Sequence, residues 1–415
     1  MSSNIFDDAN PEKTGTIQTN AEPGKLGPVG MLLRRMGRKV VEGSLTIETP
    51  SGRRLTFQGQ TPGPNGMISL RRWRALVRLL TGGHNGFAEA FMDGDWESPD
   101  LTAALEVAAR NFCPIDEAPT QFAPKLWFDR LQHFYRRNTR SGAKKNIAYH
   151  YDLGNDFYSK WLDPSMAYSS AIYADDATTL EAAQQRKFKR VADFLALRGG
   201  EKLLEIGCGW GGLAEYLIRQ HGCHVTALTL SEEQKAFSVA RLGQAGLASN
   251  CDVQLKDYRD VDGQFDRIVS IEMIEAVGEK NWPNYFGQLR DRLKPGGRAV
   301  VQAITIADER YELYRATPDF IQLHIFPGGM LPSPSILANL VKQAGLDLSA
   351  IETFGLSYAR TLAEWRSRFA AAWPYIESPK FPVQFKRMWE YYFAYCEAGF
   401  RTAMIDVGLY QLAKA

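Results

Sequence analysis

Residues 205–212, EIGCGWGG, are the stretch whose residue types and spacing most directly indicate chemistry. Glycines alternate through it, and an acid, Glu205, stands two residues before the first of them. An apolar run precedes the stretch and a helix-like apolar pattern follows it, so we expect a strand, a tight glycine turn and a helix. This arrangement is typical of a site for a nucleotide-like cofactor.

The surroundings of the glycines bear on which cofactor is bound. Gly207, Gly209 and Gly212 fit the GxGxxG pattern of dinucleotide sites, which by itself is a weak indication. A NAD site needs an acid about 20 residues further on, but the second expected strand ends in TLS, residues 229–231. The Glu205 carboxylate would also lie close to the pyrophosphate of a dinucleotide, which disfavours that cofactor. A positively charged sulfonium cofactor without phosphate fits better, which favours S-adenosylmethionine; glycines kept only for helix–strand packing are the alternative.

The elements that must position this turn alternate between strand and helix from residue 180 onward, which predicts a parallel sheet. The expected strands are 202–207, 224–230, 251–257, 265–271 and 297–304, with a last strand near 406–413. An aromatic-rich insertion at about 306–332 interrupts the alternation. Asp257 and Tyr258, at the end of the third strand, fit an adenine site that offers a carboxylate to the amine and a ring for stacking.

The first third of the chain predicts a separate small α+β domain. Residues 43–58 alternate apolar and polar around a Pro-Ser-Gly turn, as in a hairpin, and helices are expected at 70–81 and 101–112. We therefore divide the chain into a disordered start (1–29), an N-terminal accessory lipid- or membrane-associated domain (30–119), a basic helical connector (120–145) and a catalytic domain (146–415).

Composition narrows the class of protein. A net charge of +2 over 415 residues, with 45% apolar residues, is ordinary for a globular protein and excludes a general polyanion binder; no nucleic-acid module is present. Five scattered cysteines without CxxC spacing argue against disulfides and metal sites and favour the cytoplasm. Basic segments at 32–40, 71–80 and 134–145 suit peripheral contact with the inner membrane surface or, alternatively, form a solvated basic face.

Several motifs in register carry a resemblance to a known family. They are 146–173, 205–212, 256–260, 274–286, 325–333 and 385–401. In order and spacing they resemble the cyclopropane-fatty-acyl-phospholipid synthase family, which includes the mycolic acid cyclopropane synthases. The resemblance runs from about residue 146 to the C-terminus, and 86–96 is similar to that family's accessory domain. It implies a doubly wound class I methyltransferase sheet with a helical lipid-pocket insertion, and it leaves a homodimer open.

The resemblance also implies a reaction. Enzymes of this family transfer the methylene carbon of S-adenosylmethionine to the double bond of an unsaturated acyl chain of a membrane phospholipid. A carbocation forms, and a base, thought to be a bound bicarbonate, removes a proton to close a cyclopropane ring. The residues matched by position to the family's cofactor site are Tyr168, Ser169, Leu204, Glu205, Ile206, Gly207, Cys208, Gly209, Trp210, Gly211, Gly212, Thr229, Leu230, Ser231, Gln234, Asp257, Tyr258 and Ile271.

Five residues match positions with a proposed catalytic role. Glu275 corresponds to the glutamate that orients bicarbonate and Tyr358 to its tyrosine, while Ser170 and Gln302 replace the Cys and His common at that site. Cys396 matches a cysteine once proposed as catalytic, although a thiol in an aromatic helix is more typical of a core. Either bicarbonate is still bound, or proton removal has changed and the product is a methylene- or methyl-branched chain.

Three other functions remain open from the sequence alone. A methyltransferase for a soluble small molecule would share the cofactor half of the chain. A lipid-binding protein without catalysis would explain the replacements at Ser170 and Gln302, although Glu275 and the glycine turn count against it. A dehydrogenase is the third alternative.

Overall fold

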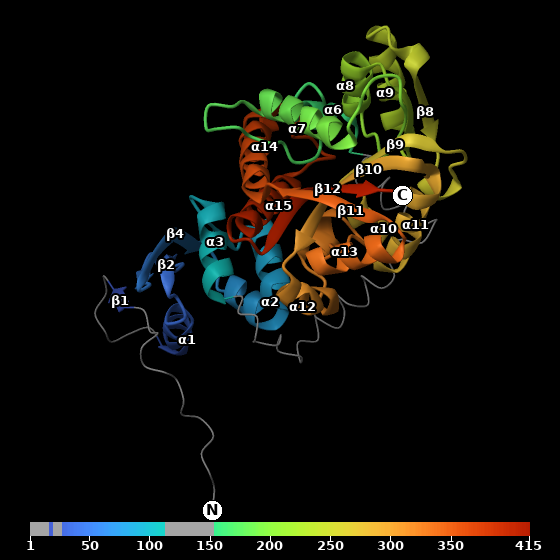
Figure 1. Cartoon of the computed structure of the whole chain (residues 1–415). Coiled ribbons are helices and arrows are strands. Elements are labelled where there is room, and N and C mark those ends of the chain that lie inside the picture. Colours follow the sequence, from blue (N-terminus) through green and yellow to red (C-terminus); the bar gives the residue numbers. More distant parts are fainter. Residues whose placement is uncertain (1–15, 20–26, 113–152) are drawn as a thin grey trace, which may run out of the picture. The chain divides into compact units, whose positions relative to one another are not determined.

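The computed structural model describes residues 16–19, 27–112 and 153–415. The chain divides into two compact units, Met1–Ala123 and Pro124–Ala415 (Figure 1). Each unit has its own sheet, of five and seven strands respectively. The expected connector, 120–145, lies outside the described residues.

The N-terminal unit is built on a five-stranded sheet in the order β1-β3-β2-β4-β5. Its strands are β1 Thr16–Thr19, β2 Glu42–Glu48, β3 Arg54–Gln58, β4 Thr61–Leu70 and β5 Trp96–Glu97, and its helices are α1 Gly27–Gly37, α2 Arg74–Met92 and α3 Leu101–Phe112. The expected hairpin is confirmed, because β2 and β3 pair in antiparallel fashion. The prediction that residues 1–29 are disordered was wrong for two segments. β1 pairs with β3, and α1 begins at Gly27.

The C-terminal unit contains the predicted doubly wound sheet. Its order is β11-β12-β10-β9-β6-β7-β8, and β12 runs antiparallel to both of its neighbours. The strands are β6 Lys202–Ile206, β7 His224–Thr229, β8 Cys251–Leu255, β9 Phe265–Ile271, β10 Leu293–Ile306, β11 Asp347–Thr353 and β12 Ile405–Ala413. β11 was not predicted, because its residues alternate between exposed and half-buried and so give no apolar run.

Helices cover both faces of this sheet. They are α6 Asn155–Ser159, α7 Leu180–Leu195, α8 Gly212–His221, α9 Glu232–Gln244, α10 Ile274–Val277, α11 Trp282–Arg292, α12 Tyr311–Ala316, α13 Pro334–Gln343, α14 Gly355–Ile376 and α15 Val383–Arg401. The insertion between β10 and α13 is helical, as expected: it contains α12 and a π-helical turn, Ile321–Ile325. None of the helices in the described part of the chain is both long and apolar enough to span a bilayer.

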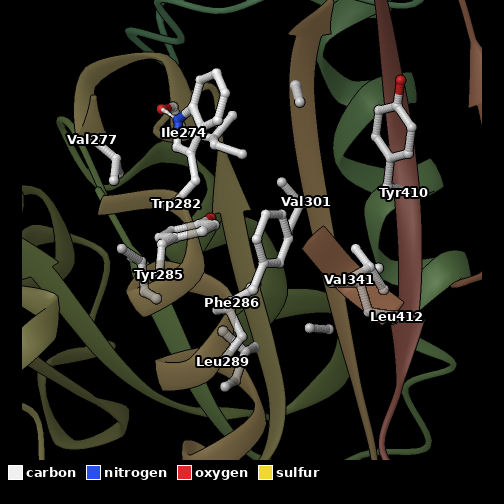
Figure 2. Packing of buried hydrophobic residues seen from close by; sticks show 14 of the residues in the cluster. Ile274, Val277, Trp282, Tyr285, Phe286, Leu289, Val301, Val341, Tyr410 and Leu412 are labelled. Carbon is white, nitrogen blue, oxygen red and sulfur yellow. Dashed lines mark hydrogen bonds between the residues drawn. The ribbon is translucent and has the colours of Figure 1, made fainter. Parts of the chain in front are cut away.

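Side-chain alternation along the strands produces two cores. In β10, Val301 packs with one buried cluster while Val300 packs with the other, because successive side chains point to opposite faces. Figure 2 shows the first cluster, in which Phe286 of α11 lies beside Val301, and Leu412 of β12 lies beside Val341. The second cluster is formed with α7 and α8. These two layers hold the carboxyl ends of the central strands in place.

Candidate active site

The glycine turn joins β6 to α8 at the centre of the sheet. β6 pairs with β7 on one side and β9 on the other, so the chain order reverses direction here. In open α/β sheets, ligands bind at the carboxyl ends of strands beside such a reversal. The predicted strand, turn and helix are therefore confirmed, and they lie where a cofactor is expected.

Gly209 and Gly212 of the turn are glycines for different physical reasons. Gly209 has a φ of +53°, and a Cβ built on it would have no heavy atom within 4 Å. A Cβ on Gly212 would lie 2.4 Å from the carbonyl oxygen of Ser165. Gly212 is thus required for close packing, as the alternative interpretation held, whereas Gly209 borders open space that a cofactor could enter.

The segment that packs on Gly212 is fixed by hydrogen bonds. The Arg241 guanidinium donates to the carbonyl oxygens of Ser165, at 2.7 Å, and Pro164, at 2.6 Å. The Asp163 carboxylate accepts from the backbone N–H of Ser165, at 2.9 Å. This strapped segment, residues 163–167, leads directly into Tyr168 and Ser169, so it carries two predicted cofactor residues to the turn.

Glu205 is a buried acid next to the turn. Its side chain is 3% exposed, and its Oε2 atom has no hydrogen-bond partner within the described ranges. Burial raises the pKa of this carboxyl to about 8, while the nearby Lys187 ammonium acts in the opposite direction. A buried carboxylate oxygen without a partner suits a cationic ligand group and opposes a phosphate. The residues therefore fit S-adenosylmethionine, because the Glu205 carboxylate could accept a hydrogen bond from its ammonium group.

The remaining predicted cofactor residues border the same strand ends. Leu204 and Ile206 belong to β6, Cys208, Trp210 and Gly211 to the turn, Thr229 and Leu230 to the end of β7, and Ile271 to the end of β9. The Ser231 hydroxyl caps α9 by accepting from the N–H of Gln234. Arg259 holds the Asp257 carboxylate at 2.8 Å, and the Tyr258 ring meets Tyr285 edge-on. These contacts give Asp257 and Tyr258 fixed orientations at the end of β8.

A residue that sequence analysis did not single out, Glu272, organises the catalytic candidates. Its carboxylate accepts hydrogen bonds from the Ser170 N–H at 2.9 Å, the Gln302 amide at 2.7 Å and the Tyr358 hydroxyl at 2.7 Å. The backbone N–H of Glu272 also donates to the Gln302 carbonyl oxygen, at 2.9 Å. Three of the five predicted residues, from three separate parts of the chain, therefore converge on one carboxylate.

The signal for Glu272 was present but ambiguous. It follows the last residue of β9 directly, at the end of the sheet where ligands bind, but Glu275 lies only three residues later. Its φ of +50° is unusual for a residue other than glycine. This conformation, which a sequence pattern does not reveal, directs the side chain toward Ser170 and Tyr358.

Glu275, which matches the family's bicarbonate-orienting glutamate, lies in α10 just after β9, and its charge interacts with that of Glu272. Its Oε1 accepts from the N–H of Ile304 at 2.6 Å, and its Oε2 has no partner in the part of the chain that the structure describes. Burial, with the nearby Glu272 charge as a second cause, raises the pKa of Glu275 to about 8. Glu275 is thus mostly protonated at neutral pH, and within the described residues its carboxyl is not hydrogen-bonded to Ser170, Gln302 or Tyr358.

Aromatic side chains surround this group. The Tyr168 ring lies 5.3 Å from Trp365 and 5.6 Å from Trp161, and its hydroxyl donates to the Tyr392 hydroxyl at 3.1 Å. Cys396 lies half-buried in α15 close to Tyr392, and desolvation raises the pKa of its thiol. A neutral thiol is a poor nucleophile, so this environment favours the core interpretation of Cys396.

The strand order, the glycine turn with its acid and the fit to a cationic cofactor together define a class I methyltransferase. The family model for mycolic acid cyclopropane synthetase matches residues 138–410, and the chain belongs to this family. It is therefore an S-adenosylmethionine-dependent enzyme of class EC 2.1.1 that modifies lipid acyl chains, and the dehydrogenase alternative is excluded.

Individual relatives cover most of the chain. It is 40% identical over 358 residues to tuberculostearic acid methyltransferase UfaA1 of Mycobacterium tuberculosis, covering 82% of this chain and 81% of the relative. It is 38% identical over 337 residues to the cyclopropane-fatty-acyl-phospholipid synthase of Escherichia coli, covering 81% and 84%.

Solved structures agree with the fold. The cyclopropane synthase MmaA2 of Mycobacterium tuberculosis superposes with a TM-score of 0.62 at 29% identity, over 65% of this chain and 98% of that one. The mycolic acid cyclopropane synthase CmaA1, in complex with SAH and CTAB, superposes with a TM-score of 0.60 at 29% identity, with the same coverage.

Proposed function

We propose that the protein transfers the methyl carbon of S-adenosylmethionine to the double bond of an unsaturated acyl chain of a membrane phospholipid, and that Glu272 is the base. The product we propose is a methylene-branched chain. The observation that carries this proposal is the Glu272 carboxylate held by Ser170, Gln302 and Tyr358.

The residues divide the chemistry between them. When bound, S-adenosylmethionine supplies an electrophilic methyl group to the alkene, and a carbocation is left on the acyl chain. The half-buried Tyr168 ring would face this cation, and such a contact contributes about 0.5–2 kcal/mol. Glu272 would then accept the proton that the cation loses, while its three donors fix the place where this happens.

The choice between ring and branch depends on the base. In the resembled family a separate bicarbonate is thought to take the proton that closes the ring. Here the Ser170 N–H, one N–H of the Gln302 amide and the Tyr358 hydroxyl already donate to Glu272, which leaves a bicarbonate only the second Gln302 N–H among these donors. Both products lose a proton from the transferred methyl group, so ring and branch differ in whether a hydride shifts before the base, here the fixed Glu272 carboxylate, accepts that proton. After a hydride shift onto the cationic carbon, loss of a methyl proton leaves a methylene branch. UfaA1, named as a methyltransferase, supports this choice.

Product analysis tests the proposal directly. Purified protein would be incubated with S-adenosylmethionine and vesicles of unsaturated phospholipid, and the acyl chains analysed by mass spectrometry before and after a hydrogenation that spares cyclopropanes. We expect a gain of one CH2 that then takes up hydrogen. A gain that resists hydrogenation would establish a cyclopropane instead, and no gain would refute acyl-chain alkylation by this protein.

We also propose that the N-terminal unit contacts the membrane through one face of α2. Trp73, Val77 and Leu80 are spaced as neighbours on one helix face, and they are 42%, 57% and 61% exposed. Arg71 and Arg72, which precede the helix, keep side-chain exposures of 55% and 63% although they pair with acids. Exposed apolar side chains beside arginines suit the interface of an anionic bilayer. This face, Trp73–Val77–Leu80, would hold a peripheral enzyme at its substrate on the cytoplasmic side.

A further inference from the structure

A buried ammonium group, that of Lys187, lies beside the site and has no role in the chemistry above. Lys187 belongs to α7 and is 1% exposed. Its Nζ donates to the Ser169 hydroxyl at 2.7 Å, and it lies 4.9 Å from the centre of the Phe188 ring. One turn earlier, the Gln184 amide donates to the Ser169 carbonyl oxygen at 2.9 Å. Helix α7 thus forms hydrogen bonds with both the side chain and the backbone of Ser169.

Glu272 holds the next residue, Ser170, by a hydrogen bond. Its carboxylate accepts the Ser170 N–H, so Lys187 and Glu272 bind two consecutive residues of the same segment. The Ala171 N–H continues this pattern by donating to the Thr361 hydroxyl, at 3.1 Å. The position of the segment relative to Glu272 therefore depends on α7 as well as on β9.

The charges around these two residues are unbalanced without Lys187. The acids that interact with the Lys187 charge are Glu272, Asp163 and Glu205. The titratable groups that interact with Glu272 are Lys187 on α7, Glu275 on α10, Tyr358 on α14 and Tyr392 on α15. Of these four, Lys187 alone brings a positive charge. Burial lowers the pKa of Lys187 to about 8, so it stays mostly protonated at neutral pH.

We propose that Lys187 is a positioning residue for the alkylation reaction: it fixes the Ser169–Ser170 segment and supplies the positive charge that keeps Glu272 a carboxylate. The inference rests on the proposed role of Glu272 as the base. Removal of a charge from a buried ionic group leaves its partner uncompensated, which favours the neutral form of that partner. A protonated Glu272 cannot accept a proton from the cation.

The test is the pH dependence of kcat at saturating S-adenosylmethionine and phospholipid vesicles. In the wild-type protein, kcat rises with pH as Glu272 ionises. In Lys187→Met the lost positive charge raises the pKa of Glu272, so the midpoint of this rise moves up by about one pH unit and kcat below the midpoint falls about tenfold. Lys187→Arg, which keeps the charge, retains the wild-type midpoint. If Lys187→Met does not fold, Lys187→Gln provides the same comparison.

The matched control is Lys189→Met on the same helix, where an exposed lysine pairs with Asp193 and the profile is expected to stay unchanged. A Lys187→Met protein that loses thermal stability or affinity for S-adenosylmethionine but keeps the wild-type midpoint would overturn the inference. Glu272→Gln separates it from the proposed function: if that variant retains wild-type turnover, Glu272 is not the base and the proposed function fails irrespective of Lys187.

Discussion

At the scale of single residues, Glu272 combines a strained backbone with a desolvated carboxylate. A φ of +50° in a residue other than glycine costs on the order of 1–3 kcal/mol. The loss of water around the carboxylate raises its pKa, which three hydrogen bonds and the Lys187 charge partly oppose. Such strain persists where the surrounding structure fixes it, commonly at functional sites. The conformation therefore supports the assignment of Glu272 as the base.

Replacement of Glu272 by glutamine tests this assignment. Glutamine keeps the shape of the side chain but accepts no proton, so we expect turnover to fall by about 10²–10⁴-fold. Affinity for S-adenosylmethionine, measured by calorimetry, should stay near the wild-type value. Glu275→Gln is the comparison: it replaces a carboxyl that burial already keeps mostly neutral, so its loss of turnover should be smaller. The reverse ranking would assign the proton transfer to Glu275.

Replacement of Glu272 by glycine tests whether the carboxylate stands in for a free anion. Glycine adopts positive φ without strain, so this change removes the carboxylate and relieves the backbone. The donors of Ser170, Gln302 and Tyr358 then become free. We expect added bicarbonate to restore turnover and to shift the product toward a cyclopropane, as measured by hydrogenation and mass spectrometry. An inactive variant that bicarbonate does not rescue would contradict this explanation.

Glu205 gives a prediction for cofactor binding. Its carboxyl, with a pKa of about 8, is mostly protonated at pH 7 in the cofactor-free protein. A bound ammonium group favours the carboxylate, so binding of S-adenosylmethionine should release a proton from Glu205. Calorimetry in two buffers of different ionisation enthalpy measures this release, which should decrease in Glu205→Gln. Equal release by both proteins would place the ammonium group elsewhere.

At the scale of elements, the unit that builds the cofactor site is β6, its turn, α8 and the strapped segment 163–167. The turn directs Gly209 toward open space, while α8 begins at Gly212, which the strapped segment approaches closely. Arg241 of α9 then fixes that segment from a third direction. The site consequently depends on the mutual packing of two helices with a segment that is more than 30 residues earlier in the chain.

Gly212→Ala should disrupt this packing. The added Cβ would meet the Ser165 carbonyl oxygen at 2.4 Å, so the strapped segment must move and carry Tyr168 and Ser169 with it. We expect a loss of stability of about 1–3 kcal/mol, measured by thermal unfolding, together with weaker cofactor binding. Gly243→Ala in α9 is the matched control, because no atom lies within 4 Å of its Cβ and alanine favours a helix. Equal behaviour of the two variants would show that the close approach has no consequence.

At the scale of the whole molecule, we propose that the two units have separate roles, with membrane contact in the N-terminal unit and the reaction in the C-terminal unit. The C-terminal unit contains the predicted cofactor and catalytic residues, whereas the N-terminal unit presents the face Trp73–Val77–Leu80. An enzyme whose substrate chains stay in a bilayer needs both functions. We infer that the small unit raises the local concentration of substrate rather than taking part in alkylation.

Replacement of Trp73, Val77 and Leu80 by serine tests this division. The loss of apolar contact should weaken sedimentation with anionic phospholipid vesicles by about tenfold or more, because each buried apolar side chain contributes about 1.5–3 kcal/mol at full burial. Turnover of substrate dispersed in detergent should change little. Val239→Ser, at a residue 50% exposed on α9 of the other unit, is the control. Unchanged vesicle binding together with an altered oligomeric state would assign the face to a second copy of the chain.

Much of the fold and part of the candidate site could be predicted from the sequence alone. The alternation of apolar runs predicts the strands and helices, and the spacing of glycines around Glu205 predicts the turn, because both depend on neighbours in the chain. Motifs in register indicated the family and identified Ser170, Gln302 and Tyr358 as members of one site. These predictions depend on the order and the types of residues along the chain, which can be read directly from the sequence.

The tertiary structure decided which acid those three residues surround. Ser170, Gln302 and Tyr358 lie far apart in the chain, and only sheet register and the packing of α14 bring them to the end of β9. There a positive φ directs Glu272 toward them, while Glu275 bonds to Ile304. Likewise, the close approach of Ser165 distinguishes Gly212 from Gly209. Such convergence depends on long-range contacts and on a backbone angle, neither of which residue spacing encodes.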